Sequence, residues 1–210
     1  MLPREYLTVT GPAEAEIEVK RSKFIAHVSP ATSVEEAEAF IAEVRRRHAQ
    51  ATHNVPAYAV GLEVETQRSS DDGEPSGTAG RPVLEVIKKS ALRNVAIVVT
   101  RYFGGTLLGT AGLIRAYGQA ASAGVATAGI ERRVLHRSLS ISVEYPLLGR
   151  VQNAIKRAGY VVEDVTYLEK VTVKVAIPMD AAQAFAERMV ELTRAQIQVE
   201  EGPAGYRRST

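Results

Sequence analysis

The segment VAIVVTRYFGGTLLGTAGLIRAYGQAASAGVATA, residues 95–128, decides the fold of the first half of the chain. It begins with a continuous apolar run over Val95–Thr100, which predicts a buried strand. A Gly-rich loop follows over residues 101–110, and the small residues from about Ala111 to Ala128 predict a helix. The order of strand, loop and helix indicates a sheet with helices packed against it.

The Gly-rich loop could form an anion site, because a helix N-terminus offers unpaired backbone N–H groups and a positive dipole end, although turn and packing glycines are the preferred interpretation of such a loop taken alone. Gly104 and Gly105 let the backbone approach a ligand closely, and Arg101 and Arg115 flank the loop. Thr110 stands where a P-loop has its lysine, which excludes a nucleotide-hydrolysing P-loop. Two interpretations remain: a site for phosphate or an RNA backbone, or glycines that serve only a tight turn and close packing.

Upstream of this segment, hydrophobic periodicity and capping signals predict further strands and helices. The expected elements are strands around 17–19, 24–28 and 58–64, a helix over 33–48 that starts with a capping box, a polar loop over 66–80 and a short helix over 82–90.

The pattern restarts in the last third of the chain. It predicts strands over 139–145, 161–167, 171–177 and 197–199, with helices over 147–158 and 185–192. This β-α-β-β-α-β order is the ferredoxin-like arrangement. We therefore expect an α+β protein of two domains, residues 1–134 and 135–210.

Composition excludes several classes of site. The chain has 210 residues and no cysteine, which excludes disulfides, iron–sulfur clusters, thiolate zinc sites and a cysteine nucleophile. No metal or cofactor is expected. No apolar stretch reaches the roughly 18 residues of a membrane span, and the N-terminus lacks an apolar signal core, so we expect a cytoplasmic protein.

The charge is uneven along the chain. Residues 1–74 carry 8 Lys and Arg against 13 Asp and Glu, whereas residues 75–133 carry 8 against 2. A basic surface formed by the second segment would suit an anionic partner. Alternatively, folding mixes the two segments and neutralises the charge.

The loop DDGEPSGTAGRP, residues 71–82, carries three carboxylates. Asp71, Asp72 and Glu74 could bind a hard cation, but a solvated cluster of turn residues is the preferred interpretation. Ser76 lacks the G-x-S-x-G context of a hydrolase nucleophile.

His53 could form an acid/base couple with Asp72 or Glu74. The preferred interpretation is a structural histidine, because no second histidine lies close in sequence to complete a metal site.

Aromatic and basic residues elsewhere carry less information. Tyr102, Phe103 and Tyr117 are interpreted as core residues and not as base-stacking platforms. In the second domain a basic face of Lys156, Arg157, Lys170 and Lys174 is opposed by Glu163, Asp164 and Glu169, so no binding surface is predicted there.

Four blocks resemble the YigZ/IMPACT family in order and spacing. They are SKFIAHV (22–28), ATHNVPAY (51–58), DDGEPSGTAGRP (71–82) and NVAIVVTRYFGGTLLGTAGLIRAYGQAA (94–121). The tail resembles the C-terminal domain of bacterial YigZ proteins, so the resemblance spans nearly the whole chain.

The resemblance implies an N-terminal two-layer α/β sandwich like the second domain of small-subunit ribosomal protein five. It also implies a C-terminal domain like the ferredoxin-like domains of elongation factor G. Both point to RNA or the translation apparatus as partner. The eukaryotic relative, IMPACT, acts in translational control by binding the activator of a stress kinase, a partner that is not carried over to a chain of this kind.

The resemblance also implies a candidate surface. Its residues are Lys23, His53, Asp72, Glu74, Ser76, Arg101, Gly104, Gly105 and Arg115. Three functions follow in order of preference: a non-enzymatic RNA- or ribosome-binding protein linked to translation, a protein-interaction regulator, and an enzyme acting on a small phosphorylated ligand.

Overall fold

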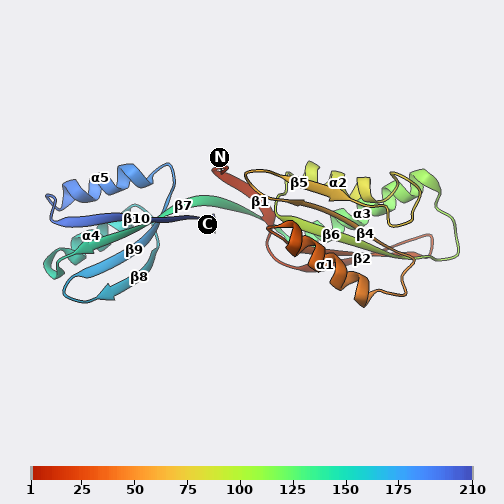
Figure 1. The fold of residues 1–210 in the computed structure, drawn as a ribbon, viewed down its shortest axis with the longest axis horizontal. Helices are drawn as coiled ribbons and strands as arrows, with labels where there is room; N and C mark the ends of the chain where they lie inside the picture. The colour runs from red at the N-terminus through yellow and green to blue at the C-terminus, as the bar shows by residue number, and fades with distance from the viewer. Residues whose placement is uncertain (1, 210) are drawn as a thin grey trace. The chain divides into compact units, whose positions relative to one another are not determined.

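A computed structural model describes residues 2–209 and divides the chain into two compact units, residues 1–132 and 133–210 (Figure 1). Strand β7 (Ile130–Val143) runs through the division. The chain therefore passes from the first unit to the second within a strand and not through a loop.

The first unit is built on a five-stranded sheet in which all neighbouring strands are antiparallel. Its order is β2 (Ala13–Val19), β3 (Ser22–Pro30), β6 (Val95–Tyr102), β4 (His53–Val60) and β5 (Thr66–Ser69). The apolar run of β6 lies at the centre and is buried along almost its whole length, as a strand covered on both faces must be.

Helices cover both faces of this sheet (Figure 1). Helix α1 (Val34–Arg47) packs on one face, against side chains that include Tyr58 and Val98. Helices α2 (Gly80–Lys89) and α3 (Gly109–Ala128) pack on the other face. The unit therefore has three layers, with the sheet between helices. The sequence predicts a two-layer sandwich, and the additional helix layer arises because β4 and β6 present apolar side chains alternately to both faces.

The approach of α3 to the sheet depends on a glycine. A Cβ atom at Gly124 would lie 2.8 Å from a methyl carbon of Val28 and 2.9 Å from the Cβ of Ala26. The small residues that predict this helix thus serve close packing on β3.

Helix α1 begins as its capping signal predicts. The Ser33 hydroxyl accepts the N–H of Glu36 at 3.3 Å. The Glu36 carboxylate reaches back to the N–H of Thr32 at 2.6 Å, one residue before the position expected for a capping box.

Two short strands were not expected. Strand β1 (Glu5–Val9) lies outside every predicted element, and β5 falls within the predicted polar loop over 66–80. Both are short, and β5 is a polar, largely exposed strand at the sheet edge. Such a strand carries no apolar alternation, so its sequence resembles that of a loop.

The second unit has the predicted β-α-β-β-α-β order, and the α+β class is confirmed. Its elements are β7, α4 (Tyr145–Arg157), β8 (Val162–Tyr167), β9 (Val171–Pro178), α5 (Ala182–Leu192) and β10 (Ile197–Arg208). The strands pair antiparallel in the order β10-β7-β9-β8, which is the ferredoxin-like order. Among residues 2–209, no helix is both long enough and apolar enough to cross a membrane.

Candidate functional site

Asp71 folds the loop between β5 and α2. Its carboxylate accepts the N–H groups of Gly77 at 2.8 Å, Ala79 at 3.1 Å and Gly80 at 2.8 Å. Burial alone would raise the pKa of Asp71, but these three backbone donors outweigh it and hold the pKa below its ordinary value. Two of the donors stand where α2 begins, so the carboxylate takes the role of a helix cap.

Asp72 ties the same loop to two other elements. One carboxylate oxygen accepts the N–H of Asn54 on β4 at 2.6 Å, and the other pairs with Arg45 of α1 at 2.9 Å. Asp72 itself has a φ of 48°, a left-handed conformation that Asp adopts more readily than most residues. The loop is thereby anchored to the sheet and to the helix on its other face.

Glu74 turns into the protein interior. Its Oε1 accepts a hydrogen bond from Nη1 of Arg101 at 2.6 Å and another from the hydroxyl of Tyr117 at 2.7 Å. The side chains of Glu74 and Arg101 are only 4% and 6% exposed. Burial, together with the hydrogen bond and the negative charge of Glu74, raises the pKa of the Tyr117 hydroxyl far above its ordinary value.

The guanidinium of Arg101 also lies near two aromatic rings. Its central carbon is 5.5 Å from the ring centre of Phe24 and 5.6 Å from that of Phe103. Such contacts stabilise a cation inside a protein. Arg101 is therefore buried and paired, and it does not present its charge to a ligand outside.

His53 is held by the backbone of the loop. Its Nδ1 lies 2.7 Å from the carbonyl oxygen of Asp72, which assigns the proton to Nδ1 because a carbonyl can only accept. Its Nε2 lies 3.8 Å from Oε1 of Glu74, beyond hydrogen-bond distance. The preferred structural role of His53 agrees with this geometry.

The three carboxylates of the loop do not converge. Each one faces its own partners, so the interpretation of a solvated turn cluster is wrong. Among residues 2–209 no group of three Asp, Glu or His side chains is arranged to hold a metal ion. The loop acids instead fasten the loop to the sheet and helices around it.

In the Gly-rich loop, Gly104 is required for packing. A Cβ atom there would lie 2.0 Å from backbone atoms of Arg21, and the N–H of Gly104 donates to the hydroxyl of Ser22 at 3.1 Å. Gly105 has a φ of +79° and open space where a Cβ would be. The two glycines therefore have different tasks, and only Gly105 leaves backbone accessible.

The remaining residues that the sequence analysis named differ in how far they are exposed. Phe103 is 48% exposed, so its interpretation as a core residue is wrong, whereas Tyr117 is fully buried. Lys23 is partly exposed on β3 and pairs with Glu16 at 2.6 Å. Ser76 is exposed in the loop before α2.

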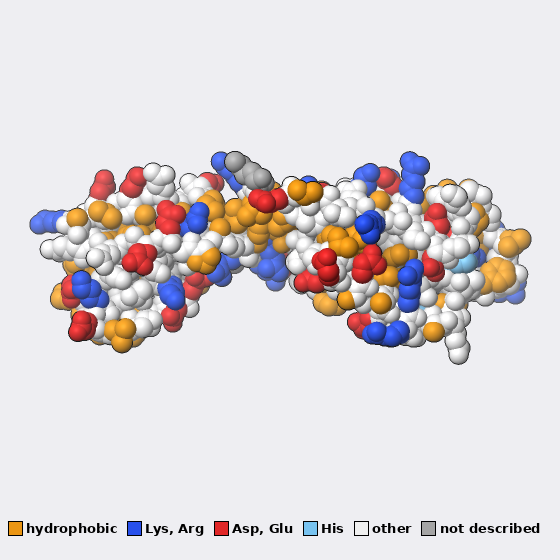
Figure 2. Space-filling view, in the orientation of Figure 1, with side chains coloured by type: hydrophobic (Ala, Val, Ile, Leu, Met, Phe, Trp, Pro, Cys, Tyr) orange, Lys and Arg blue, Asp and Glu red, His pale blue; other side chains and the backbone are white. Residues whose placement is uncertain are grey.

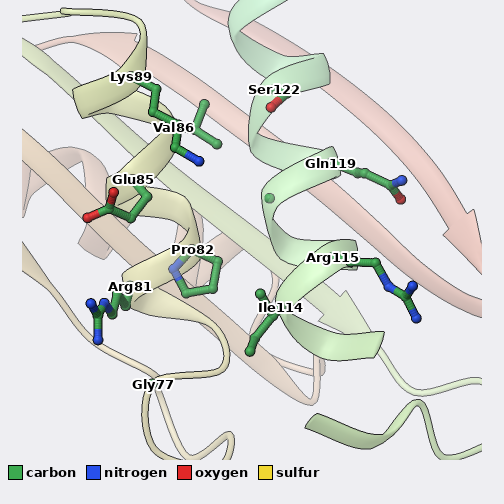
Figure 3. A pocket seen from close by; sticks show the side chains of 11 residues that line it. Gly77, Arg81, Pro82, Glu85, Val86, Lys89, Ile114, Arg115, Gln119 and Ser122 are labelled. Carbon is green, nitrogen blue, oxygen red and sulfur yellow. The ribbon is translucent and has the colours of Figure 1, made fainter. Parts of the chain in front are cut away.

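Arg115 belongs to a separate groove between α2 and α3, with a volume of about 700 Å³. The groove is lined by Gly77, Arg81, Pro82, Glu85, Val86, Lys89, Ile114, Arg115, Gly118, Gln119 and Ser122. Figure 3 shows Val86 and Ile114 between the two helices, with Arg81 on the outer side of α2 and Arg115 on the outer side of α3. Of the expected site residues, His53, Asp72, Glu74 and Arg101 come together, whereas Arg115 lines the groove.

Folding neutralises part of the basic segment 75–133. The ion pairs are Arg101 with Glu74, Arg93 with Glu65, Lys88 with Glu85 and Arg132 with Glu5. Acidic and basic side chains are accordingly mixed over the visible face of the unit that carries α1 (Figure 2). Among residues 2–209, no carboxylate lies within 4.0 Å of the cationic groups of Arg81, Lys89 or Arg115, and all three line the same groove.

The sequence analysis did not predict that Arg81 and Lys89 belong to one binding surface. The signal was present, since residues 81, 85 and 89 are four apart and share one face of a helix. The predicted helix begins at Pro82, whereas α2 begins at Gly80, so Arg81 lies outside the predicted helix.

Two comparisons of sequence place the chain among known proteins. Residues 20–125 match the Impact N-terminal domain, and residues 141–196 match a domain of unknown function, DUF1949. The chain is 41% identical over 201 residues to IMPACT family member YvyE of Bacillus subtilis (strain 168), which covers 96% of this chain and 93% of the relative. The chain belongs to the IMPACT family.

Two further relatives and one solved structure are similar to the chain over different shares of its length. IMPACT family member YigZ of Escherichia coli (strain K12) is 31% identical over 196 residues, 92% of this chain and 96% of the relative. Protein IMPACT of Rattus norvegicus is 36% identical over 100 residues, which are 45% of this chain and 31% of the relative. A crystal structure of a hypothetical protein matches 94% of this chain and 97% of its own, with a TM-score of 0.63 at 30% identity.

Proposed function

We propose that this IMPACT family chain is a non-enzymatic binding protein of the cytoplasm that attaches to RNA or the ribosome through the α2–α3 groove and takes part in the regulation of translation. One observation carries the proposal. The cations of the basic segment that lack a carboxylate partner in the described chain, Arg81, Lys89 and Arg115, all line this groove.

The groove combines the two kinds of contact that RNA requires. Arg81 and Arg115 stand at opposite rims of the groove, on the outer sides of α2 and α3, and Lys89 stands two turns from Arg81 on α2. Arginine and lysine bind backbone phosphates. Val86 and Ile114 supply an apolar floor for a sugar or an unstacked base. The single acid of the lining, Glu85, is 3.3 Å from Lys88, so its charge is partly balanced.

The geometry favours binding over catalysis. A catalytic cluster needs a polar group directed at a substrate. Glu74 and Arg101 are directed at each other in the interior, and Nδ1 of His53 is occupied by a backbone carbonyl. In place of Arg101, we assign the phosphate contacts to Arg115 and to its neighbours in the groove.

A protein-interaction role is the second candidate, and a different observation favours it. Phe103 and Leu107 of the Gly-rich loop are 48% and 83% exposed. Exposed apolar side chains that form a contiguous patch mark protein-binding surfaces, and these two stand four residues apart in one loop. Binding of a protein at this loop would be insensitive to the groove cations.

The test measures fluorescence anisotropy of a labelled single-stranded RNA and a labelled RNA hairpin at two salt concentrations. The variant Arg81→Gln/Lys89→Gln/Arg115→Gln is compared with a control of equal charge, Arg4→Gln/Lys20→Gln/Arg46→Gln, whose residues are also exposed on the first unit. We expect the groove variant to bind about tenfold more weakly and to flatten the slope of log K against log salt for single-stranded RNA by about 2, since each phosphate contact contributes about 0.7.

Three results would contradict the proposal: no RNA binding by the unaltered chain at low salt, equal losses in the groove variant and its control, or an affinity that stays flat as salt is raised. Capture of a protein partner that is lost in Phe103→Ser/Leu107→Ser, but kept in the groove variant, would favour the second candidate.

A further inference from the structure

A second basic groove lies in the C-terminal unit, between α4 and α5. Its volume is about 420 Å³. It is lined by Arg150, Asn153, Ala154, Arg157, Arg188 and Leu192. Three arginines and no carboxylate face this space, in a unit whose charges looked balanced in the sequence.

Helix periodicity builds the groove. Residues 150, 153, 154 and 157 recur at intervals of three and four and so share one face of α4. Val151 and Ile155, which follow Arg150 and Ala154 in the sequence, are fully buried in the core. On α5 the buried Met189 follows Arg188 in the same way. The arginines therefore stand next to the residues through which each helix packs into the core.

The arginines keep their charge available. All three are exposed, and among residues 2–209 no carboxylate lies within 4.0 Å of any of their guanidinium groups. Arg150 donates one hydrogen bond from Nη1 to the carbonyl oxygen of Leu192, at 3.3 Å. The other N–H groups of its guanidinium are left for a ligand. Other cations of the same unit are paired, for example Lys170 with Glu144 at 3.4 Å.

Helix stabilisation does not account for the cluster. Cations stabilise a helix through its dipole only in the last turn. Arg157 meets this condition at the end of α4, but Arg150 lies near the middle of α4 and Arg188 in the interior of α5. Two of the three positions thus have no local reason to be basic.

We propose that this groove binds adjacent phosphate groups of an RNA backbone. Guanidinium forks bind phosphate oxygens in pairs. Arg150 and Arg157 are separated by about 10 Å along the helix axis, from seven residues at 1.5 Å each, so the cluster spans more than one phosphate. Leu192 is the one large apolar side chain of the lining, so the groove lacks the apolar anchor pocket that a peptide partner would fill.

This site is independent of the α2–α3 groove, which lies in the other unit. An RNA that reaches both grooves gains affinity because the second contact becomes intramolecular. The variant Arg150→Gln/Arg157→Gln/Arg188→Gln therefore tests the second groove without altering the first.

The experiment measures binding of a labelled single-stranded RNA to the full chain by fluorescence anisotropy. The control variant is Lys156→Gln/Lys170→Gln/Lys174→Gln, which removes the same charge from the same unit. A titration of inorganic pyrophosphate into the isotope-labelled chain, followed by nuclear magnetic resonance, locates the phosphate site. A urea unfolding curve checks that each variant keeps its stability, as exposed positions should.

We expect the arginine variant to bind RNA about tenfold more weakly and the control less than about threefold more weakly. Pyrophosphate should shift the signals of Asn153 and Arg188. Equal losses in the two variants would overturn the proposal, as would unchanged RNA binding in the arginine variant. Pyrophosphate shifts at the groove with unchanged RNA binding would assign the site to a small phosphate ligand and overturn the RNA assignment. Displacement of RNA by poly-glutamate as readily as by pyrophosphate would overturn the preference for phosphate.

Discussion

The side chains of Glu74 and Arg101 form a buried ion pair, with Oε1 and Nη1 2.6 Å apart. Glu74 belongs to the loop before α2, and Arg101 to the central strand β6. The pair fastens the loop, and with it the start of α2, to the middle of the sheet. The residues that most resemble a catalytic constellation in the sequence thus hold the wall of the α2–α3 groove in place.

Replacing Arg101 by methionine should destabilise the chain strongly. The substitution leaves the Glu74 carboxylate buried without its cation, a change that costs about 3–5 kcal/mol of unfolding free energy. The matched control is Arg93→Met, because Arg93 pairs with Glu65 in a more exposed position and should contribute only about 0–1 kcal/mol. Urea unfolding measures both. Equal losses in the two variants would contradict the structural role of the buried pair.

Tyr117 should remain protonated in the folded chain at the pH at which free tyrosine ionises. Burial and the neighbouring Glu74 raise its pKa, so Tyr117→Phe should leave the phenolate absorbance of the folded chain unchanged as the pH rises past the free-tyrosine value of about 10. Because the pKa is higher in the folded than in the unfolded state, stability is fully present below about pH 10 and is lost as the pH rises above it.

The same substitution removes the hydrogen bond from the Tyr117 hydroxyl to Glu74. We expect a loss of about 1.5–3 kcal/mol in unfolding free energy at neutral pH, the range for a hydrogen bond to a charged group. A phenolate signal that Tyr117→Phe reduces in the folded chain would show that the hydroxyl is accessible.

Asp71→Asn should weaken the loop in a way that depends on pH. The carboxylate accepts three backbone N–H groups, and the loss of these charged hydrogen bonds should cost about 1–3 kcal/mol at pH 7. The pKa of Asp71 is lowered in the folded state, so its contribution is present above the unfolded pKa of about 3.9 and is lost as the pH falls through the folded value.

Urea unfolding of the Asp71→Asn variant and the unaltered chain at pH 7 and at about pH 2 would test this dependence. The difference between the two proteins should shrink at the lower pH. A constant difference at both pH values would be evidence against stabilisation by the charged form.

Gly104→Ala and Gly105→Ala should both lower the stability of the chain, the first through tight packing and the second through backbone conformation. The first places a methyl group 2.0 Å from the backbone of Arg21, an overlap that costs more than the about 1–3 kcal/mol of ordinary overpacking. The second meets open space but forces a residue other than glycine to a φ of +79°, at about 1–2 kcal/mol. Thermal unfolding ranks them, and a larger loss for Gly105→Ala would contradict the close contact at Gly104.

Much of the fold could be predicted because its signals are local. The apolar run of β6, the Ser33 cap and the β-α-β-β-α-β order each depend on neighbouring residues within a few turns. The edge strand β5 could not be predicted, because its pairing with β4 and not its own sequence makes it a strand.

The site was predicted less well. The family motif identified the residues that meet around the loop, but it did not show that Arg101 faces inward or that Tyr117 is its neighbour through Glu74. These partners are 27 and 43 residues from Glu74 along the chain, so only the register of β6 and the packing of α3 bring them together.

The sequence by itself determined the two-part α+β organisation, the absence of any cysteine chemistry and the presence of an unevenly charged chain, because these depend on composition and on short-range periodicity. The tertiary structure alone decided which cations remain available to a partner. It paired Arg93 and Arg101 with distant acids and left Arg115 without one in the described chain. The energy of an ion pair depends on the distance between the two charges in space and not on their separation along the chain. The partners of a cation are therefore fixed only when the chain has folded.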